Sequence, residues 1–280
     1  MSKIFSKEIL RLIVSFILSL LICLGLFFTA ICADLLIFSN PSFILSCAEK
    51  SNYSKFAVSQ ITEELNDLAI PSGLPKNFFT DKIDEISFSK LFYNCIDNQA
   101  KGNKNYTLNV DKFKKEVHAR VTEYSQNEGG GLTSEVEKDI ERFSQECSNI
   151  YLSYANPSLI NYIFDILVSV KKYLWIALAI SFAFTLVVGI FLFKLNHKGA
   201  FLKNCFCSCC GAALTLGIIP ICLIATNEIA RISISSKSLY AITTTMAEQF
   251  LWIMIISAAV LLFVSLIFLG VKIFRLIFKG

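Results

Sequence analysis

Charged residues are scarce in this chain. Only 17% of its 280 residues are Asp, Glu, Lys or Arg, and 54% are hydrophobic. A soluble domain normally carries about 25% charged residues, so the deficit places the chain among membrane proteins. Residues 39–172 hold 15 Lys and Arg against 18 Asp and Glu, and the remaining residues hold 11 against 4. A basic excess confined to the apolar part indicates membrane topology, and we expect no nucleic-acid partner.

The patterns that carry common enzymatic chemistry are missing as well. The sequence has no GxSxG or HExxH motif, no phosphate-binding glycine loop and no pair of intramembrane aspartates. Its only histidines, His118 and His197, fit solvated side chains better than catalytic bases. We therefore predict that the protein is not an enzyme and that it has no catalytic residue, cofactor or bound metal.

Cysteine is not scarce, and one cluster places Cys205, Cys207, Cys209 and Cys210 within six residues. Structural zinc sites usually use two separated CxxC-like pairs, a pattern that this cluster does not match. We interpret the cluster as small, polarisable residues that pack between helices. Palmitoylation and metal binding are the alternatives.

Four long apolar runs are present, at residues 12–33, 173–193, 205–226 and 250–271, and the first continues past Asp34. Each reaches the length of about 20 residues that spans the hydrocarbon core of a bilayer. The first run is too long for the apolar part of a signal peptide, so we interpret it as an uncleaved anchor. The sequence therefore predicts four transmembrane helices.

Basic residues flank these runs at the N-terminus, in the loop between the second and third runs, and at the C-terminus. They are Lys3, Lys7 and Arg11, then Lys194, Lys198 and Lys203, and finally Lys272, Arg275 and Lys279. In a four-span protein these segments share one side of the membrane, and an excess of Lys and Arg marks that side as cytoplasmic. We predict a multi-pass plasma-membrane protein with both termini in the cytoplasm and residues 39–172 outside.

The large polar segment, residues 39–172, has apolar residues at helical spacing and no sustained two-residue alternation. We expect four helices and no sheet. The first ends before Pro71, and the second covers about residues 78–98. The third is capped by Asp111, and the fourth begins with a Ser134–Glu137 capping box. The inward side chains expected for the second helix are Ile83, Ile86, Leu91, Cys95 and Ile96. Gly129–Gly131 should form a flexible joint between the last two helices.

The predicted fold is an all-α membrane protein with a helical extracytoplasmic domain inserted between transmembrane helices 1 and 2. Residues 1–38 make the cytoplasmic tail and the first transmembrane helix. Residues 39–172 make the extracytoplasmic domain. Residues 173–280 make transmembrane helices 2–4, a short cytoplasmic loop and the C-terminal tail.

A few residues stand out as candidates for a site. Cys95 and Cys147 both fall on expected inward faces, so we favour them as a disulfide pair, with buried free thiols as the alternative. Asp34 is an acidic residue inside an apolar run, where ionisable residues are costly and often functional. The alternative is that Asp34, about five residues from the end of the run, simply reaches the membrane interface. Glu228 and Arg231 lie one helical turn apart at the outer end of the third run, and we expect them to pair.

The segment Ile61–Leu68, the turn Pro71–Pro75 and the layout of the chain resemble a group of uncharacterised four-span membrane proteins of Gram-positive bacteria. This resemblance implies the four-span layout and no activity. The layout also looks like the FtsX and MacB type of permease, in which a cytoplasmic ATPase transmits motion to an extracytoplasmic domain. The chain departs from those permeases in its short N-terminal tail and short cytoplasmic loop, which leave little surface for an ATPase.

The leading hypothesis is an integral membrane protein whose helical extracytoplasmic domain binds or senses something at the cell surface. Its expected partners are the lipid bilayer and an envelope or membrane protein. One alternative is a permease-like subunit coupled to a cytoplasmic ATPase. Another is a small transporter or channel that uses Asp34 and the pair Glu228 and Arg231. The sequence leaves the oligomeric state open.

Overall fold

A computed structural model describes residues 2–103, 108–128, 133–196 and 198–277. The predictions for His197, Lys279 and the joint Gly129–Gly131 lie outside these residues. Within the described ranges the chain is helical, with 87% helix and no strand. The all-α class is confirmed, and helical spacing of apolar residues was the signal that identified it.

The chain forms two compact units. The first, which we call the spanning unit, contains Met1–Asn40, Ser169–Ile232 and Met246–Gly280. The second, the helical domain, contains Pro41–Val168 and Ser233–Thr245. The helical domain therefore takes in residues 233–245, part of the segment between the third and fourth apolar runs, in addition to most of the large polar segment between the first two.

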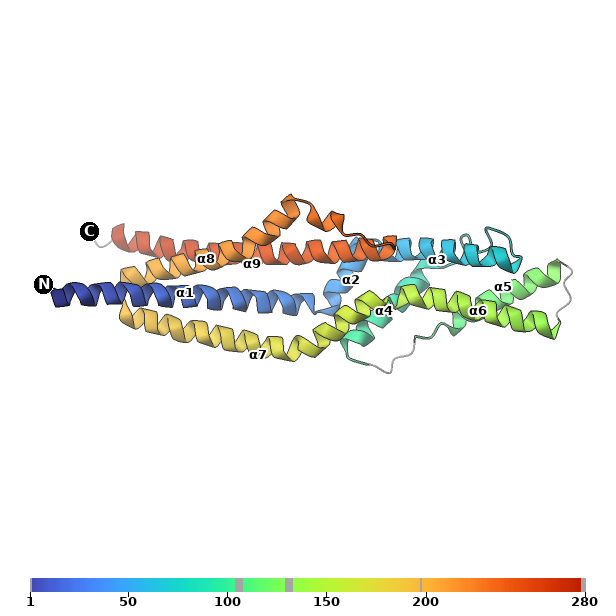
Figure 1. Cartoon of the computed structure of the whole chain (residues 1–280), viewed down its shortest axis with the longest axis horizontal. Helices are drawn as coiled ribbons and strands as arrows, with labels where there is room; N and C mark the ends of the chain where they lie inside the picture. Colours follow the sequence, from blue (N-terminus) through green and yellow to red (C-terminus); the bar gives the residue numbers. More distant parts are fainter. Residues whose placement is uncertain (1, 104–107, 129–132, 197, 278–280) are drawn as a thin grey trace. The chain divides into compact units, whose positions relative to one another are not determined.

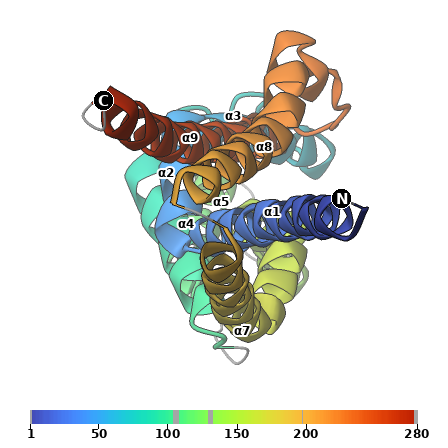
Figure 2. The same cartoon turned by 90° about the vertical axis from the view of Figure 1, so that its left-hand side faces the viewer.

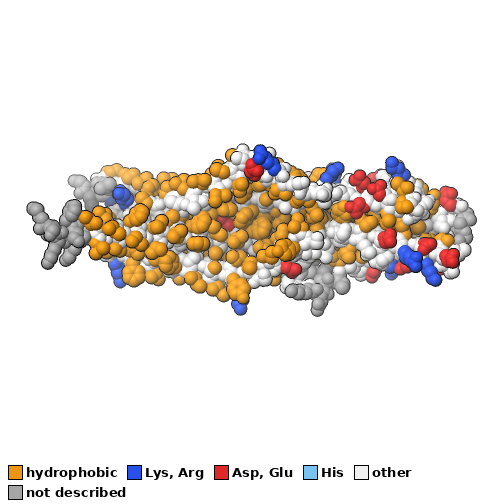
Figure 3. Space-filling view, in the orientation of Figure 1, with side chains coloured by type: hydrophobic (Ala, Val, Ile, Leu, Met, Phe, Trp, Pro, Cys, Tyr) orange, Lys and Arg blue, Asp and Glu red, His pale blue; other side chains and the backbone are white. Residues whose placement is uncertain are grey.

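Four helices are long and apolar enough to span a membrane, as the four apolar runs predicted. They are α1 (Ser2–Phe38), α7 (Ser158–Leu195), α8 (Lys198–Ala225) and α9 (Lys237–Ile277). Each helix is longer than the apolar run that it contains. Figure 1 labels all four helices. Hydrophobic side chains cover most of the visible surface of these helices (Figure 3).

Within the spanning unit, α1 lies between α7 and α8 (Figure 2). Ser19 of α1 and Ser208 of α8 share a hydrogen bond of 2.7 Å. A Cβ atom at Gly25 would collide with Oγ1 of Thr185 in α7, so glycine is needed for this close approach. Small residues at helix contacts are typical of membrane bundles, where packing replaces the hydrophobic driving force.

The helical domain contains five helices before α7, one more than predicted. They are α2 (Pro41–Lys50), α3 (Tyr53–Ala69), α4 (Glu85–Ala100), α5 (Asp111–Asn127) and α6 (Ser134–Ala155), with a 3₁₀ turn η1 (Ile70–Ser72) after α3. The additional helix, α2, begins with proline at its first position, where the missing amide hydrogen has no cost. Its buried residues are Ile44, Cys47 and Ala48.

The prediction for the second helix of this domain was wrong at its start and at Ile86, whereas the predicted inward residues Cys95 and Ile96 are buried. Asp81 adopts a left-handed φ of 56°, and α4 begins only at Glu85. Asp84 caps α4 by accepting hydrogen bonds from the amides of Ile86 and Ser87. Ile86 therefore lies in the first turn and is 65% exposed.

The buried stripe of α4 includes two aromatic residues that the prediction left out. Phe88 and Phe92 lie at four-residue spacing with Ile96, and all three side chains are fully buried. The two phenylalanines pack on Tyr53 of α3, whose ring centroid lies 4.6 Å from that of Phe92. The hydroxyl of Tyr53 donates to the carbonyl of Tyr154 at 2.6 Å, so its polar atom is satisfied inside the core.

The predicted caps of α5 and α6 are each displaced by one residue. Asp111 is the first residue of α5, and its amide donates to Oδ1 of Asn109 at 2.9 Å. Thr133 caps α6, because its hydroxyl oxygen accepts from the amide of Val136. Ser and Thr cap helices by the same chemistry, and both stand at this helix start, so the sequence alone could not choose between them.

Candidate binding pocket in the helical domain

A pocket of about 580 Å³ opens in the helical domain between η1, α5 and α6. Its apolar lining includes Leu74, Val121, Ile140 and Phe143. These four side chains are 5% to 9% exposed, so they belong to the core and also face the pocket. Sites for small ligands typically have volumes of about 300–1,000 Å³ and mostly apolar walls.

The turn after α3 forms one wall of the pocket. Pro71 starts the turn, and Gly73 ends it in a left-handed conformation with φ of 76°. The amide of Leu74 then donates to the carbonyl of Ala69 at 3.1 Å. Gly73 has open space around its missing Cβ, so its backbone angle, and not crowding, requires glycine there. The predicted turn over residues 70–75 is therefore present, and it brings Leu74 to the pocket.

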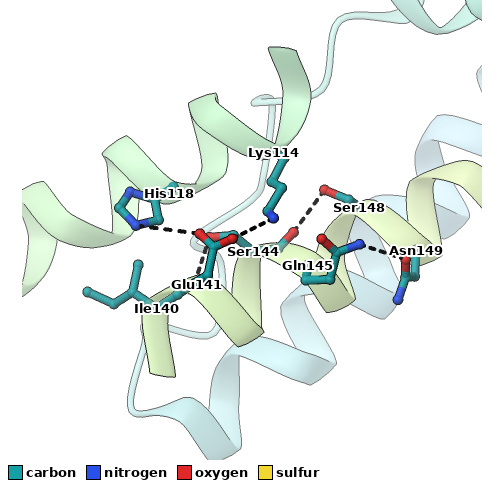
Figure 4. A network of polar contacts seen from close by, with 8 residues as sticks. All are labelled: Lys114, His118, Ile140, Glu141, Ser144, Gln145, Ser148 and Asn149. Carbon is teal, nitrogen blue, oxygen red and sulfur yellow. Dashed lines mark hydrogen bonds and ion pairs between the residues drawn. The ribbon is translucent and has the colours of Figure 1, made fainter. Parts of the chain in front are cut away.

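The other walls are α5 and α6, and an ion pair connects these two helices. Nζ of Lys114 in α5 lies 2.6 Å from Oε1 of Glu141 in α6 (Figure 4). Nε2 of His118 lies 3.9 Å from the second oxygen of the same carboxylate. The hydrogen bond from Lys114 lowers the pKa of Glu141. His118 thus lies beside this ion pair and close to Ile140, which lines the pocket (Figure 4).

Two buried serines let α6 pack closely against its neighbours. The hydroxyl of Ser144 donates to the carbonyl of Ile140 at 2.7 Å. The hydroxyl of Ser148 donates to the carbonyl of Ser144 at 2.8 Å (Figure 4). Each serine is thereby satisfied within its own helix while presenting a small side chain to the core.

Two aromatic residues of the pocket lining pack on neighbouring aromatic rings. Phe143 stacks on Phe79, with ring centroids 6.1 Å apart and an interplanar angle of 24°. Tyr124, which also lines the pocket, meets Phe78 edge-on at 5.7 Å. The amide of Phe79 donates to Oδ1 of Asn66 at 2.9 Å and fixes the chain after the turn. The phenylalanine pair is therefore positioned by backbone bonding as well as by packing.

The charged groups among the described lining residues of the pocket are acidic. They are Glu128 and Asp139, and no Lys, Arg or His of the described residues lines the pocket. The helical domain as a whole holds 14 Lys and Arg against 18 Asp and Glu. Acidic side chains are prominent over this domain in the space-filling view (Figure 3). The pocket therefore combines an apolar floor with negative charge.

A second pocket, of about 340 Å³, lies at the junction of α4, α6 and α7 and is lined mainly by polar groups. Nε2 of Gln99 donates to Oδ1 of Asn156 at 2.8 Å and to Oδ1 of Asn161. The thiol of Cys95 donates to the same oxygen of Asn156 at 3.1 Å. Asn156 follows the end of α6, so these bonds stabilise the break between α6 and α7.

Cys95 and Cys147 are both buried, as the sequence predicted. Burial raises the pKa of Cys95 to about 11 and that of Cys147 to about 12. Cys47 is also buried, with a pKa raised to about 11 for the same reason. The disulfide between Cys95 and Cys147 stays a prediction.

Asp34 lies in the spanning unit and is only 1% exposed. The hydroxyl of Ser257 in α9 donates to its Oδ1 at 2.6 Å. The other carboxyl oxygen, Oδ2, is buried and has no hydrogen-bond partner. The structure thus places this acid inside the helix bundle, in contact with a different helix, as expected for an ionisable residue in a membrane span.

Glu228 and Arg231 form the expected pair in a 3₁₀ turn, η2 (Glu228–Arg231), with Nη1 of arginine 2.8 Å from Oε1 of glutamate. Both side chains are well exposed, so the ion pair has little structural weight. It is not brought together with Asp34 by any hydrogen bond or ion pair that the structure describes.

The cysteine cluster lies on α8. Cys205 and Cys209 are buried, whereas Cys207 is exposed on another face. Within the described residues, no group of three or more His, Cys, Asp or Glu side chains could hold a metal ion. The arrangement fits packing by the two buried cysteines.

No protein-family model, curated protein or solved structure matches the chain. Inferences about function therefore rest on its own residues.

Proposed function

We propose that the protein is a multi-pass plasma-membrane protein whose helical domain lies on the extracytoplasmic side and binds or senses a ligand there. The pocket between η1, α5 and α6 is the observation that carries this proposal. It has the volume and the apolar lining of a small-ligand site, and it lies in a domain with its own core. The four apolar helices then serve as the membrane anchor.

Ligand binding can be tested by placing a photo-crosslinking amino acid in the pocket. Ser72 is an exposed lining residue and is a suitable position. Glu146 on the exposed face of α6, outside the pocket lining, is the matched control. We expect illumination of cells to give a specific adduct from position 72 and none from position 146. Equal labelling from both positions, or no adduct from position 72, would contradict a ligand site in the pocket.

The orientation rests on the distribution of basic residues, and it has its own test. Single cysteines in place of Lys237 and Lys203, in a chain without its other cysteines, should react differently with a membrane-impermeant maleimide. We expect labelling of position 237 from outside the cell and of position 203 only after permeabilisation. The reverse result would overturn the proposed orientation and leave the pocket unaffected.

A small transporter or channel is the second candidate because Asp34 is a buried acid with one unmatched oxygen in the spanning unit. Intramembrane acids often mark ion or proton pathways. Ion flux in reconstituted vesicles should then be lost in Asp34→Asn. Flux that is absent, or unchanged in this variant, would count against a transport role for Asp34. The permease-like alternative instead predicts that an ATPase subunit co-purifies with the intact protein.

A further inference from the structure

We infer that the pocket between η1, α5 and α6 binds an amphipathic organic cation, a molecule with an apolar or aromatic body and an amine or quaternary ammonium group. This inference rests on the proposed function and names the ligand class of the same site. It is supported by three properties of the pocket: its apolar floor, its two carboxylates and the helix ends that surround it.

The apolar floor selects the body of the ligand. Val121, Ile140 and Phe143 lie side by side in the lining and come from both α5 and α6. They bury against the core while leaving a cavity of about 580 Å³ open to one side. An apolar body the size of one or two aromatic rings would displace water from this surface, which is favourable in proportion to the apolar area covered.

The carboxylates select the charge of the ligand. Glu128 is the C-cap of α5 and Asp139 lies in the second turn of α6, and among the described residues no basic side chain lines the pocket with them. The closest basic partner of Asp139 is Arg142, at 3.7 Å, and both side chains are more than three-quarters exposed. A pair this exposed is weak, so Asp139 can exchange it for a ligand. Tyr124 adds an aromatic ring, and such rings attract cations.

The helix ends favour a cation over an anion. The C-terminal end of α5, at Asn127, carries partial negative charge and has no basic residue in its last turn. The N-terminal end of α6 would attract an anion, but Glu135 and Glu137 already stand in its first turn. An anion in the pocket would therefore meet acidic side chains, and none of the described lining residues is basic.

The test uses the full-length protein in nanodiscs of zwitterionic phosphatidylcholine, with empty nanodiscs subtracted. The probes share a naphthyl body and differ in charge: 2-(1-naphthyl)ethylammonium, 2-(1-naphthyl)ethanol and 1-naphthylacetate. Binding is measured by equilibrium dialysis. We expect the ammonium to bind most tightly, the alcohol more weakly and the carboxylate least. Tightest binding of the carboxylate or of the alcohol would overturn the inference.

Variants locate the binding. The double variant Glu128→Gln, Asp139→Asn should weaken ammonium binding about tenfold, the effect of losing two partly exposed ion pairs, and leave alcohol binding unchanged. Glu146→Gln removes an acid of α6 outside the pocket lining and should change nothing. Ser125→Trp fills the rim of the pocket and should abolish binding of all probes. Ile140→Trp fills the floor of the pocket and should also abolish binding of all probes.

These outcomes separate the inference from the proposed function. Ammonium binding that survives both tryptophan variants lies elsewhere and would overturn the inference. Equal binding of all three probes, lost in Ser125→Trp, would support a ligand pocket while refuting selection for a cation. Absence of any bound probe would also refute the cation inference, and the photo-crosslinking from position 72 would then decide on the pocket itself.

Discussion

Ser257 of α9 donates its hydroxyl hydrogen to Oδ1 of Asp34 in α1 at 2.6 Å, and it is the only hydrogen-bond partner of that carboxylate among the described residues. The bond joins the first and last spanning helices across more than two hundred residues of sequence. A buried carboxylate with a single donor depends strongly on that donor, because removing it leaves the full desolvation cost of the acid uncompensated.

Ser257→Ala should therefore destabilise the spanning unit by about 1–3 kcal/mol, the usual cost of leaving a buried polar group unpaired. Ser265 is the matched control, because it is buried on the same helix but donates to the carbonyl of Leu262 within that helix. Ser265→Ala should have a clearly smaller effect. Thermal unfolding of the purified protein in one detergent measures both. Equal losses of stability would mean that the bond to Asp34 carries no special weight.

The sequence was sufficient to predict the four spans because long apolar runs have few alternative explanations. It also indicated the turn after α3, since proline and glycine at positions 71 and 73 restrict the backbone directly. The start of α4 and the exposure of Ile86 could not be predicted from apolar spacing or from proline and glycine positions. Aliphatic residues in the sequence favoured a face containing Ile86, and only the left-handed backbone at Asp81 and the cap at Asp84 set the observed start.

The pocket could not be derived from sequence either, because its lining comes from segments about 70 residues apart. Val121, Ile140 and Phe143 were recognisable as core residues from helical spacing. The cavity beside them depends on where Leu74 lies after the turn. The same limit applies to Asp34: its apolar setting was visible, but its partner Ser257 was not, since serine is common in spanning helices and only packing selects one.

The burial of two residues of the helical domain, Phe143 in α6 and Ile86 in α4, can be tested by truncating each of them to alanine. Phe143 is 7% exposed, and Phe143→Ala should cost about 3–5 kcal/mol, as for other buried aromatic residues. Ile86 is 65% exposed, and Ile86→Ala should change the stability by about 0.5 kcal/mol or less. Chemical unfolding of the full-length variants measures both. A large loss for Ile86→Ala would support the inward face predicted from sequence and contradict the structure.

The cap of α4 predicts a dependence on pH. Hydrogen bonds from the side chain and amide of Ser87 lower the pKa of Asp84. A lowered folded-state pKa means that the cap contributes stability above the ordinary value of about 3.9 and loses it as the pH falls through the lowered value. The protection of the Ile86 and Ser87 amides, measured as exchange relative to the intrinsic rate at each pH, should therefore fall on acidification. In Asp84→Ala these amides should show little protection at any pH, and protection that still falls with acidification as in the unchanged protein would contradict the cap.

Gln60 of α3 binds the residues at the start of α9. Its Oε1 accepts hydrogen bonds from the amide of Ser238 at 2.8 Å and from the hydroxyl of Ser236 at 3.1 Å. Gln60→Ala should raise amide exchange over residues 233–245, which mass spectrometry can locate. Gln145→Ala is the control, because Gln145 is exposed and bonds only to Asn149 on its own helix. Unchanged exchange in Gln60→Ala would show that packing alone holds the segment.

Thiol labelling can test the burial of the three cysteines of the helical domain and the disulfide predicted between two of them. Because burial raises the pKa values of Cys47, Cys95 and Cys147 to about 11, 11 and 12, the reactive thiolate is rare near neutral pH. In the native protein a water-soluble maleimide should leave all three unlabelled. Denaturation without a reductant then tests the disulfide predicted from sequence. Labelling of all three means free thiols, whereas labelling of Cys47 alone means that Cys95 and Cys147 are bonded to each other.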